Sequence, residues 1–209
     1  MQHNDLAKDL LEIGAVQVKT DHYFTWTSGI KSPIYCDNRL TMSYPIIRAK
    51  ITNRFLAMIE EMDIQPDVIA GTATAGIPHA AWLSDKLRIP MVYVRSKPKA
   101  HGKGNQIEGA FQKGQHVLVI EDLISTGMSS IETANALRDE ELNVLGVYAI
   151  FTYGLQKGLD QFKKAGLFHQ TILTFDDILE LLFKEKNISK EEFDTLLAWR
   201  NDLSQCNRQ

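Results

Sequence analysis

The sequence predicts an α/β domain in which a mostly parallel β-sheet is covered by helices on both faces. From about residue 68 onward, short apolar runs alternate with segments of helical periodicity, as expected of parallel strands joined by helices. Two of these runs end in loops of small or hydroxyl-bearing residues, which are typical of ligand sites at the carboxyl ends of strands. With 209 residues, of which 44% are hydrophobic and 23% charged, the chain can bury a core without a metal or a disulfide.

The first forty residues are expected to add a helix and a small hairpin to this sheet. From Asn4 to Val18 the chain is expected to form a helix that is capped by Asn4 or Asp5. Tyr23–Trp26 has the composition of a short strand, and Ile34–Cys36 is its expected hairpin partner.

A second helix and the alternating strands follow. The helix is expected from about Pro45, with Ser43 as its cap. Its apolar face comprises Ile47, Ile51, Phe55 and Ile59. Strands are expected at Val68–Gly71, Met91–Val94, Val117–Ile120 and Leu145–Phe151, with helices up to Leu87 and over Ser129–Glu141. Near the C-terminus, Ser189 and Glu192 have the spacing of a capping box ahead of another helix.

Composition and charge argue against several classes of protein. A net charge of −3 is not that of a surface devoted to nucleic acid. The two cysteines, Cys36 and Cys206, lie far apart and outside any metal-binding spacing, which fits a reducing cytoplasm. Residues 1–19 mix charged residues with leucines, so no secretory signal is expected, and no apolar run is long enough to span a membrane.

The most informative stretch is Val117–Ser130. Val117–Ile120 is expected to be a buried strand, with two carboxylates, Glu121 and Asp122, at its carboxyl end. The turn that follows opens a helix, so its main-chain N–H groups and the helix dipole can bind a phosphate. The turn also offers the hydroxyl groups of Ser125, Thr126 and Ser129, and Gly127 lets the backbone approach a ligand closely.

Acids beside a phosphate site are favourable when the ligand also presents hydroxyl groups or a divalent cation. In ribose 5-phosphate, the phosphate would lie in the turn while the 2′- and 3′-hydroxyls donate to Glu121 and Asp122. The stretch is neither a Walker loop nor a GxGxxG loop. The alternative is an ordinary helix cap with no ligand. Two acids, two hydroxyls and a glycine within seven residues favour the ribose phosphate site.

A row of cationic residues follows the strand at Met91–Val94. The row occupies every second position, at Arg95, Lys97, Lys99, His101 and Lys103. In an extended segment these side chains would share one side. Such a row suits a ligand with several negative charges, such as pyrophosphate, although lysines also protect the edge hairpins of sheets. Because the chain also carries a phosphate turn, we favour the ligand.

Three motifs resemble those of a known family. Glu121–Ser129 resembles the signature with which type I phosphoribosyltransferases bind phosphoribosyl pyrophosphate (PRPP). Arg95–Gly109 resembles the mobile catalytic loop of the orotate phosphoribosyltransferases, and Phe24–Asp37 resembles the hood that covers the base in that group. The resemblance spans Phe24 through Phe151. It implies the type I phosphoribosyltransferase fold and transfer of the 5-phosphoribosyl group of PRPP to orotate, which gives orotidine 5′-monophosphate and pyrophosphate in de novo pyrimidine (UMP) biosynthesis.

The resemblance also implies a set of site residues. The catalytic residues would be Lys99, His101, Lys103 and Asp122. The PRPP-binding residues would be Arg95, Lys99, His101, Thr72, Thr74, Glu121, Asp122, Leu123, Ile124, Ser125, Thr126, Gly127, Met128 and Ser129. Orotate would contact Ser125, Lys31 and Tyr35. The alternatives are an exposed turn for Lys31, the core of the hood for Tyr35, and close helix–sheet packing for the loop Gly71–Gly76.

Cofactor, assembly and location follow from the same resemblance. It implies Mg²⁺ that is held mainly by PRPP, with help from Glu121 and Asp122. It also implies a cytoplasmic homodimer in which the catalytic loop reaches the neighbouring subunit's site, with no nucleic acid or membrane as partner. Residues 1–209 would form one domain, with a hood over roughly 1–40, a core over roughly 45–175 and C-terminal helices over 176–209.

Three positions depart from another branch of the family. Thr27 and Ala75 stand where that branch has lysines, and Tyr153 stands where it has an arginine. Main-chain amides or Lys31 are the candidates to replace them. Two other functions are weighed. The hood motif argues against a purine phosphoribosyltransferase, and mild acidity with an intact basic segment argues against a PRPP-sensing regulator that binds RNA or DNA.

Overall fold

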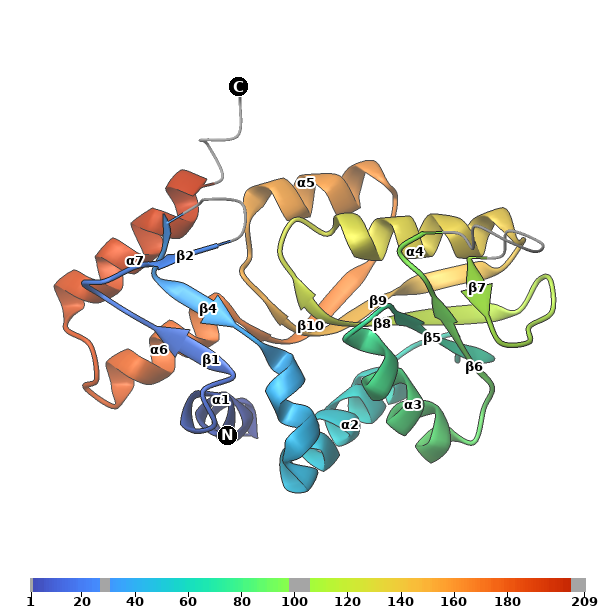
Figure 1. Ribbon diagram of the computed structural model, residues 1–209, viewed down its shortest axis with the longest axis horizontal. Coiled ribbons are helices and arrows are strands. Elements are labelled where there is room, and N and C mark those ends of the chain that lie inside the picture. The colour runs from blue at the N-terminus through green and yellow to red at the C-terminus, as the bar shows by residue number, and fades with distance from the viewer. Residues whose placement is uncertain (1, 27–30, 98–105, 204–209) are drawn as a thin grey trace.

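A computed structural model of the chain describes residues 2–26, 31–97 and 106–203, and these contain a six-stranded sheet (Figure 1). The strand order is β10-β9-β8-β5-β6-β7. The strands are β5 (Val68–Thr72), β6 (Met91–Val94), β7 (Ile107–Glu108), β8 (His116–Ile124), β9 (Asn143–Thr152) and β10 (His169–Thr174). All neighbouring pairs are parallel except β6 and β7, which pair antiparallel at one edge. The predicted mostly parallel sheet is therefore confirmed.

The sheet is buried on both faces because consecutive residues of a central strand point to opposite sides. In β8, Leu118 and Ile120 share a core with α2 (Pro45–Glu60) and α3 (Gly76–Leu87). Val117 and Val119 share a second core with α4 (Met128–Asp139) and α5 (Gln156–Lys164). Figure 1 shows α4 and α5 above the sheet and α2 and α3 below it. Two apolar cores thus hold the strand that carries Glu121 and Asp122.

The N-terminal helix is shorter than the sequence suggested. α1 spans Gln2–Glu12, so the predicted helix up to Val18 is wrong, and neither Asn4 nor Asp5 precedes it as a cap. Gly14 adopts a φ of 73°, a left-handed conformation that glycine takes at little cost and that commonly ends a helix. The chain then turns into strand β1 (Val16–Val18).

The strand pairing of the N-terminal region also differs from the expected hairpin. β1 pairs antiparallel with β4 (Ile34–Cys36), so that Val16 lies opposite Cys36. β2 (Phe24–Thr25) pairs instead with β3 (Lys31–Ser32). The prediction that Ile34–Cys36 pairs with Tyr23–Trp26 is therefore wrong. Ile34 and Val16 are both buried in the core that includes α1, and this burial favours the longer-range pairing.

α2 begins at Pro45, as predicted, and its apolar face is confirmed. Ile47, Ile51, Phe55 and Ile59 are all buried. Ser43 is not its cap, however, because Ser43 belongs to the preceding 3-10 helix η1 (Asn38–Ser43). The residue before α2 is Tyr44, whose side chain makes no capping hydrogen bond.

Two capping boxes organise the C-terminal helices α6 (Phe175–Lys184) and α7 (Lys190–Leu203). The box predicted at Ser189 and Glu192 is confirmed. The Ser189 N–H donates to the Glu192 carboxylate at 2.7 Å, and the Glu192 N–H donates to Ser189 Oγ at 3.2 Å. A second box at Thr174 and Asp177, which was not predicted, starts α6. None of the helices within the described ranges is long and apolar enough to cross a membrane.

His79 on α3 gives the fold a predicted sensitivity to acid. The side chain is buried against Trp82, with ring centroids 5.2 Å apart, and burial lowers its pKa to about 4. Because the unfolded histidine has a pKa near 6.5, the unfolded state gains a proton first as the pH falls. Stability should therefore be lost between about pH 6.5 and pH 4, by about 3 kcal/mol in total.

Unfolding by urea at a series of pH values would measure this loss. The His79→Phe variant should have a shallower pH dependence in that window than the wild-type chain. Replacement of the exposed His22 by Gln serves as the matched control and should leave the pH dependence unchanged. An equal slope in the wild-type chain and the His79→Phe variant would assign the acid sensitivity to other groups.

Candidate active site

A cleft of about 400 Å³ lies at the carboxyl ends of β5 and β8. Its described lining comes from three segments: Cys36, Asp37 and Arg39; Ala73, Thr74 and Ala75; and Glu121, Asp122, Leu123 and Ser129. Because parallel strands end at one edge of the sheet, the segments that follow them meet there. The structure thus brings the predicted acid pair next to the predicted small-residue loop.

Glu121 is held by the first turn of α4. β8 extends to Ile124, so Glu121 lies within the strand and not beyond it, and only 4% of the residue is exposed. The hydroxyl groups of Ser129 and Ser130 donate to one carboxylate oxygen at 3.1 and 3.2 Å. The N–H of Asp122 donates to the other oxygen at 3.1 Å. Ser129, predicted to donate to a phosphate, here donates to Glu121.

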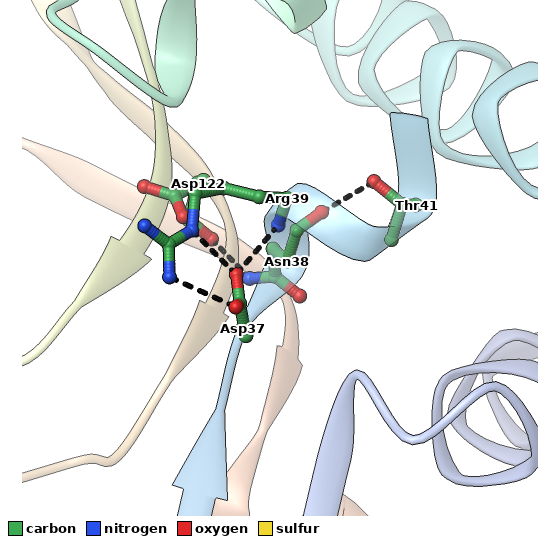
Figure 2. A network of polar contacts seen from close by, with 5 residues as sticks. All are labelled: Asp37, Asn38, Arg39, Thr41 and Asp122. Carbon is green, nitrogen blue, oxygen red and sulfur yellow. Dashed lines mark hydrogen bonds and ion pairs between the residues drawn. The ribbon is translucent and has the colours of Figure 1, made fainter. Parts of the chain in front are cut away.

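Asp122 is half-buried, and its main chain is fixed from outside the sheet. The side-chain amide of Asn38 donates to the main-chain oxygen of Asp122 at 2.7 Å (Figure 2). Asn38 is fully buried, and its main-chain oxygen accepts a hydrogen bond from the Thr41 hydroxyl at 2.6 Å. This contact joins η1 to β8 and sets the position of Asp122 relative to the N-terminal region.

Burial raises the pKa of both acids. For Glu121 the charge of Asp122 adds to the effect of burial. For Asp122, burial is opposed by hydrogen bonding with Glu121 and by the charge of Arg39. Two adjacent carboxylates in a poorly solvated cleft repel each other when both are ionised. The pair therefore favours a ligand that brings hydroxyl protons or a cation.

The turn after β8 ends at a glycine, and no side chain caps the main-chain N–H groups at the start of α4. The residue that precedes α4 is Gly127, with a φ of 77° and no side-chain capping bond. A Cβ atom there would lie 2.5 Å from the ring of Phe162, so this position requires glycine on two counts. The side-chain cap that the alternative interpretation requires is therefore not formed. The turn retains the main-chain N–H groups that an anion needs.

The loop after β5 packs closely against β8. A Cβ atom on Gly76 would lie 2.4 Å from the main-chain oxygen of Ile120, so close packing accounts for this glycine. Thr74 and Ala75 line the cleft, whereas Thr72 is buried and is not part of the described lining. The peptide bond between Ala73 and Thr74 is cis. The loop therefore packs against β8 through Gly76 and faces the cleft with Thr74 and Ala75.

The basic segment begins and ends at the β6–β7 pair. The Arg95 N–H donates to the Gln106 oxygen at 2.9 Å, and the Arg95 guanidinium lies 3.6 Å from the Glu108 carboxylate. The edge hairpin of the alternative interpretation is thus present. Three residues of the predicted row, Lys99, His101 and Lys103, lie outside the described residues.

The orotate-binding candidates of the hood do not line the cleft among the described residues. Lys31 is exposed, as the alternative predicted, but it lies in strand β3 and not in a turn, and it donates to the Thr25 hydroxyl at 2.7 Å. Tyr35 is 38% exposed and packs on Phe24, with ring centroids 5.7 Å apart, so it is not a core residue. Tyr153 is buried, and burial raises its pKa. Thr27 lies outside the described residues.

Sequence reasoning missed the polar run that follows β4. Asp37, Asn38 and Arg39 come directly after β4, and only Asp37 belongs to a motif that we considered, as the last residue of the hood motif, without a role assigned to it. Their place in the cleft depends on the pairing of β4 with β1 and on the bond from Asn38 to Asp122. The one available signal was three polar residues at the end of a strand.

Comparison with known proteins places this chain in a family. A family model described as a phosphoribosyl transferase domain matches residues 44–178. A protein of Oceanobacillus iheyensis called orotate phosphoribosyltransferase is 60% identical over 201 residues, which cover 96% of this chain and 100% of the relative. A protein of Fusobacterium nucleatum with the same name is 53% identical over 205 residues, which cover 97% of each chain.

Solved structures give a consistent result. Orotate phosphoribosyltransferase from Aeropyrum pernix has a TM-score of 0.75 and 30% identity, and the match covers 85% of this chain and 97% of that one. UMP synthase of Leishmania donovani has a TM-score of 0.77 and 28% identity, and the match covers 94% of this chain and 42% of that one. The residues that the family model matches include the acid pair, the turn after it and the loop after β5.

Proposed function

Because the chain belongs to the orotate phosphoribosyltransferase family, it transfers the 5-phosphoribosyl group of PRPP to orotate, and we propose that the cleft at the ends of β5 and β8 is where this transfer occurs. The products are orotidine 5′-monophosphate and pyrophosphate, so the reaction is a step of pyrimidine biosynthesis. One observation carries the assignment of the cleft. The acid pair, with Glu121 buried and Asp122 half-buried, lies near the end of β8, just before a turn whose main-chain donors have no capping side chain.

In the proposed complex the ribose phosphate lies along the end of β8. The 5-phosphate accepts hydrogen bonds from main-chain N–H groups of the segment Leu123–Ser129, which runs from the end of β8 to the first turn of α4, and from the hydroxyls of Ser125 and Thr126. The ribose hydroxyls donate to Asp122, which faces the cleft, while Glu121 stays bonded to Ser129 and Ser130. Each hydrogen bond that the ribose donates offsets the cost of burying a charged carboxylate, which is the main cause of the raised pKa of both acids.

The diphosphate and the base take the other two walls of the cleft. The diphosphate lies against the loop that contains Thr74, where small residues let main-chain groups approach it. Orotate lies on the hood side, near Ser125, with Lys31 and Tyr35 as further candidates for contact with it. The described position of Lys31 is held by Thr25, so that contact would require the lysine to exchange this bond for one to orotate.

The reaction places two electrostatic demands on the chain. A nitrogen of orotate attacks C1′ of PRPP as pyrophosphate departs, so positive charge grows on the ribose and negative charge grows on the diphosphate. The ionised Asp122 stabilises the positive charge on the ribose. The cationic segment after Arg95, with Lys99, His101 and Lys103, stabilises the negative charge on the diphosphate. Orotate's ring nitrogen is already acidic, so no protein base is assigned.

Mg²⁺ fits this donor set as a cofactor that is shared with the substrate. Among the described residues no group of three acids, histidines or cysteines is placed to hold a metal ion. Mg²⁺ often relies on one or two carboxylates together with phosphate oxygens of the substrate. Glu121 and Asp122 would help to hold it, and when bound it offsets negative charge on the diphosphate.

Assembly and location form part of the same proposal. The family resemblance favours a homodimer in which the segment after Arg95 completes the neighbouring subunit's site. Within the described ranges Cys36 is a buried thiol in no disulfide, which supports a reducing location such as the cytoplasm. The names of the relatives favour orotate over purine bases as the acceptor, and they favour an enzyme over a regulator that binds RNA or DNA.

A spectroscopic assay tests the function directly. The absorbance of orotate in the ultraviolet should fall when the protein is mixed with orotate, PRPP and Mg²⁺. Omission of PRPP, or addition of a chelator, should stop the change because the ribosyl donor or the charge-neutralising ion is then lost. Adenine, hypoxanthine and uracil in place of orotate serve as controls. Pyrophosphate release with a purine and none with orotate would contradict the assignment.

A further inference from the structure

Arg39 is a cation that the structure holds at the wall of the cleft. It lies on η1, and 63% of its side chain is exposed. The Asp37 carboxylate accepts hydrogen bonds from Arg39 Nε at 2.6 Å and from Nη2 at 2.8 Å (Figure 2). The Asp37 carboxylate also accepts a hydrogen bond from the Arg39 N–H at 3.2 Å. The planar guanidinium is thereby fixed in orientation by its neighbour two positions earlier.

This pairing leaves much of the guanidinium available to a ligand. An arginine carries five N–H donors in a fixed fork, and the bonds from Nε and Nη2 to Asp37 use two of them. Within the described part of the chain, Nη1 has no hydrogen-bond partner. An arginine oriented in advance loses less conformational freedom when a ligand binds. Arg39 is therefore prepared to donate to a second anion.

The charge of the cleft requires such a donor. Its described lining includes three acids, Asp37, Glu121 and Asp122, and Arg39 is the cation among these lining residues. PRPP brings a diphosphate into this acidic surrounding, and the small residues Ala73–Ala75 on the facing wall carry no charge. Repulsion between the diphosphate and the acids would disfavour binding unless a fixed cation lies close by.

We propose that Arg39 is a further substrate-binding residue, which donates hydrogen bonds to the diphosphate of PRPP across the cleft from Ala73–Ala75. This role deepens the proposed function and rests on it. Asp37 acts as the positioning residue, because it holds the fork of Arg39 toward the cleft. The charge of Arg39 also offsets the absence of a lysine at Ala75. The diphosphate is favoured over the orotate carboxylate because it bears more negative charge and because the uncharged loop lies in the same cleft.

PRPP and ribose 5-phosphate differ by the diphosphate, so a comparison of their binding distinguishes a contact with the diphosphate from a structural role of Arg39. Calorimetric titration with PRPP and with ribose 5-phosphate should be carried out on the wild-type chain and on Arg39→Ala, Arg39→Lys and Asp37→Asn. Lys113→Ala is the matched control, because Lys113 is also an exposed cation paired with an acid, Glu141, but precedes β8. Circular dichroism during heating checks that each variant folds, and exposed ion pairs stabilise proteins weakly.

The expected result is selective for the diphosphate. Arg39→Ala should raise the Kd for PRPP by about 10- to 100-fold, as is typical for loss of a hydrogen bond between charged groups, and should leave the Kd for ribose 5-phosphate unchanged. Arg39→Lys and Asp37→Asn should give smaller increases, because they retain the charge but lose the oriented fork. Lys113→Ala should match the wild-type chain.

Three outcomes would overturn the role of Arg39. These are wild-type affinity for PRPP in Arg39→Ala, equal weakening of both ligands, or an increase in the KM for orotate with no change for PRPP. The last would assign Arg39 to the orotate carboxylate. A wild-type chain that binds neither ligand would instead overturn the proposed function itself, so the two failures can be told apart.

Discussion

Replacement of Asp122 by alanine should raise the Kd for PRPP by about 100-fold, since each hydrogen bond to a charged group contributes about 1.5–3 kcal/mol. Asp122 faces the cleft, and its backbone is fixed by Asn38 through a bond of 2.7 Å. A carboxylate on a main chain that is fixed in this way accepts hydrogen bonds from the ribose hydroxyls with less loss of conformational freedom. Calorimetric titration with PRPP would measure the change.

Two further variants show whether the effect belongs to the carboxylate. Asp122→Asn keeps the shape of the side chain but removes the charge, so its Kd should lie between those of the wild-type chain and Asp122→Ala. The exposed Asp63 lies in the turn between α2 and β5, and Asp63→Ala should bind PRPP as the wild-type chain does. Wild-type affinity in Asp122→Ala would end the role of Asp122 as ribose anchor.

The central sheet could be predicted because its signals are local. Val117–Ile120 and Val68–Gly71 are short apolar runs, and a strand that is buried on both faces needs nothing more to be recognised. The position of the turn that we propose to bind phosphate followed from the same run, since ligands bind a parallel sheet at the edge where its strands end. The sequence did not reveal that β8 continues to Ile124, because that length depends on pairing with β9.

The strand pairing of the N-terminal region could not be predicted, because the strands are short and because β1 and β4 are far apart in sequence. β2 and β3 have two residues each, so neither carries a periodic pattern. The pairing of β1 with β4 is favoured by burial of Val16 and Ile34, which only the folded chain reveals. The role proposed for Arg39 could not be predicted from the sequence for the same reason. It requires β4 to be placed against the cleft by contacts that are far apart in sequence.

Replacement of Lys99 by alanine should lower kcat by about 10²–10³ and change the Kd for PRPP much less, as expected when a contact made mainly in the transition state is lost. The segment that contains Lys99 leaves the sheet at Arg95 and returns at Gln106. These two residues are hydrogen-bonded to each other at the end of β6. This end of β6 lies at the same edge of the sheet as the cleft, because β6 is parallel to β5. Steady-state kinetics and calorimetric titration would separate the two effects. An unchanged kcat would remove Lys99 from the mechanism.

Mixing two impaired variants, at a PRPP concentration that leaves Asp122→Ala mostly unoccupied, tests whether Lys99 acts in its own subunit's cleft or in the neighbouring one. If the segment after Arg95 completes the partner subunit's site, a dimer of one Lys99→Ala chain and one Asp122→Ala chain has one intact site and one site with both changes. Random re-association of equal amounts in a symmetric dimer should then restore about a quarter of the wild-type activity. If Lys99 served its own cleft, every site in the mixture would lack one residue, and no activity would return. Recovery of activity would therefore assign the acid pair and the lysine to different chains of one site.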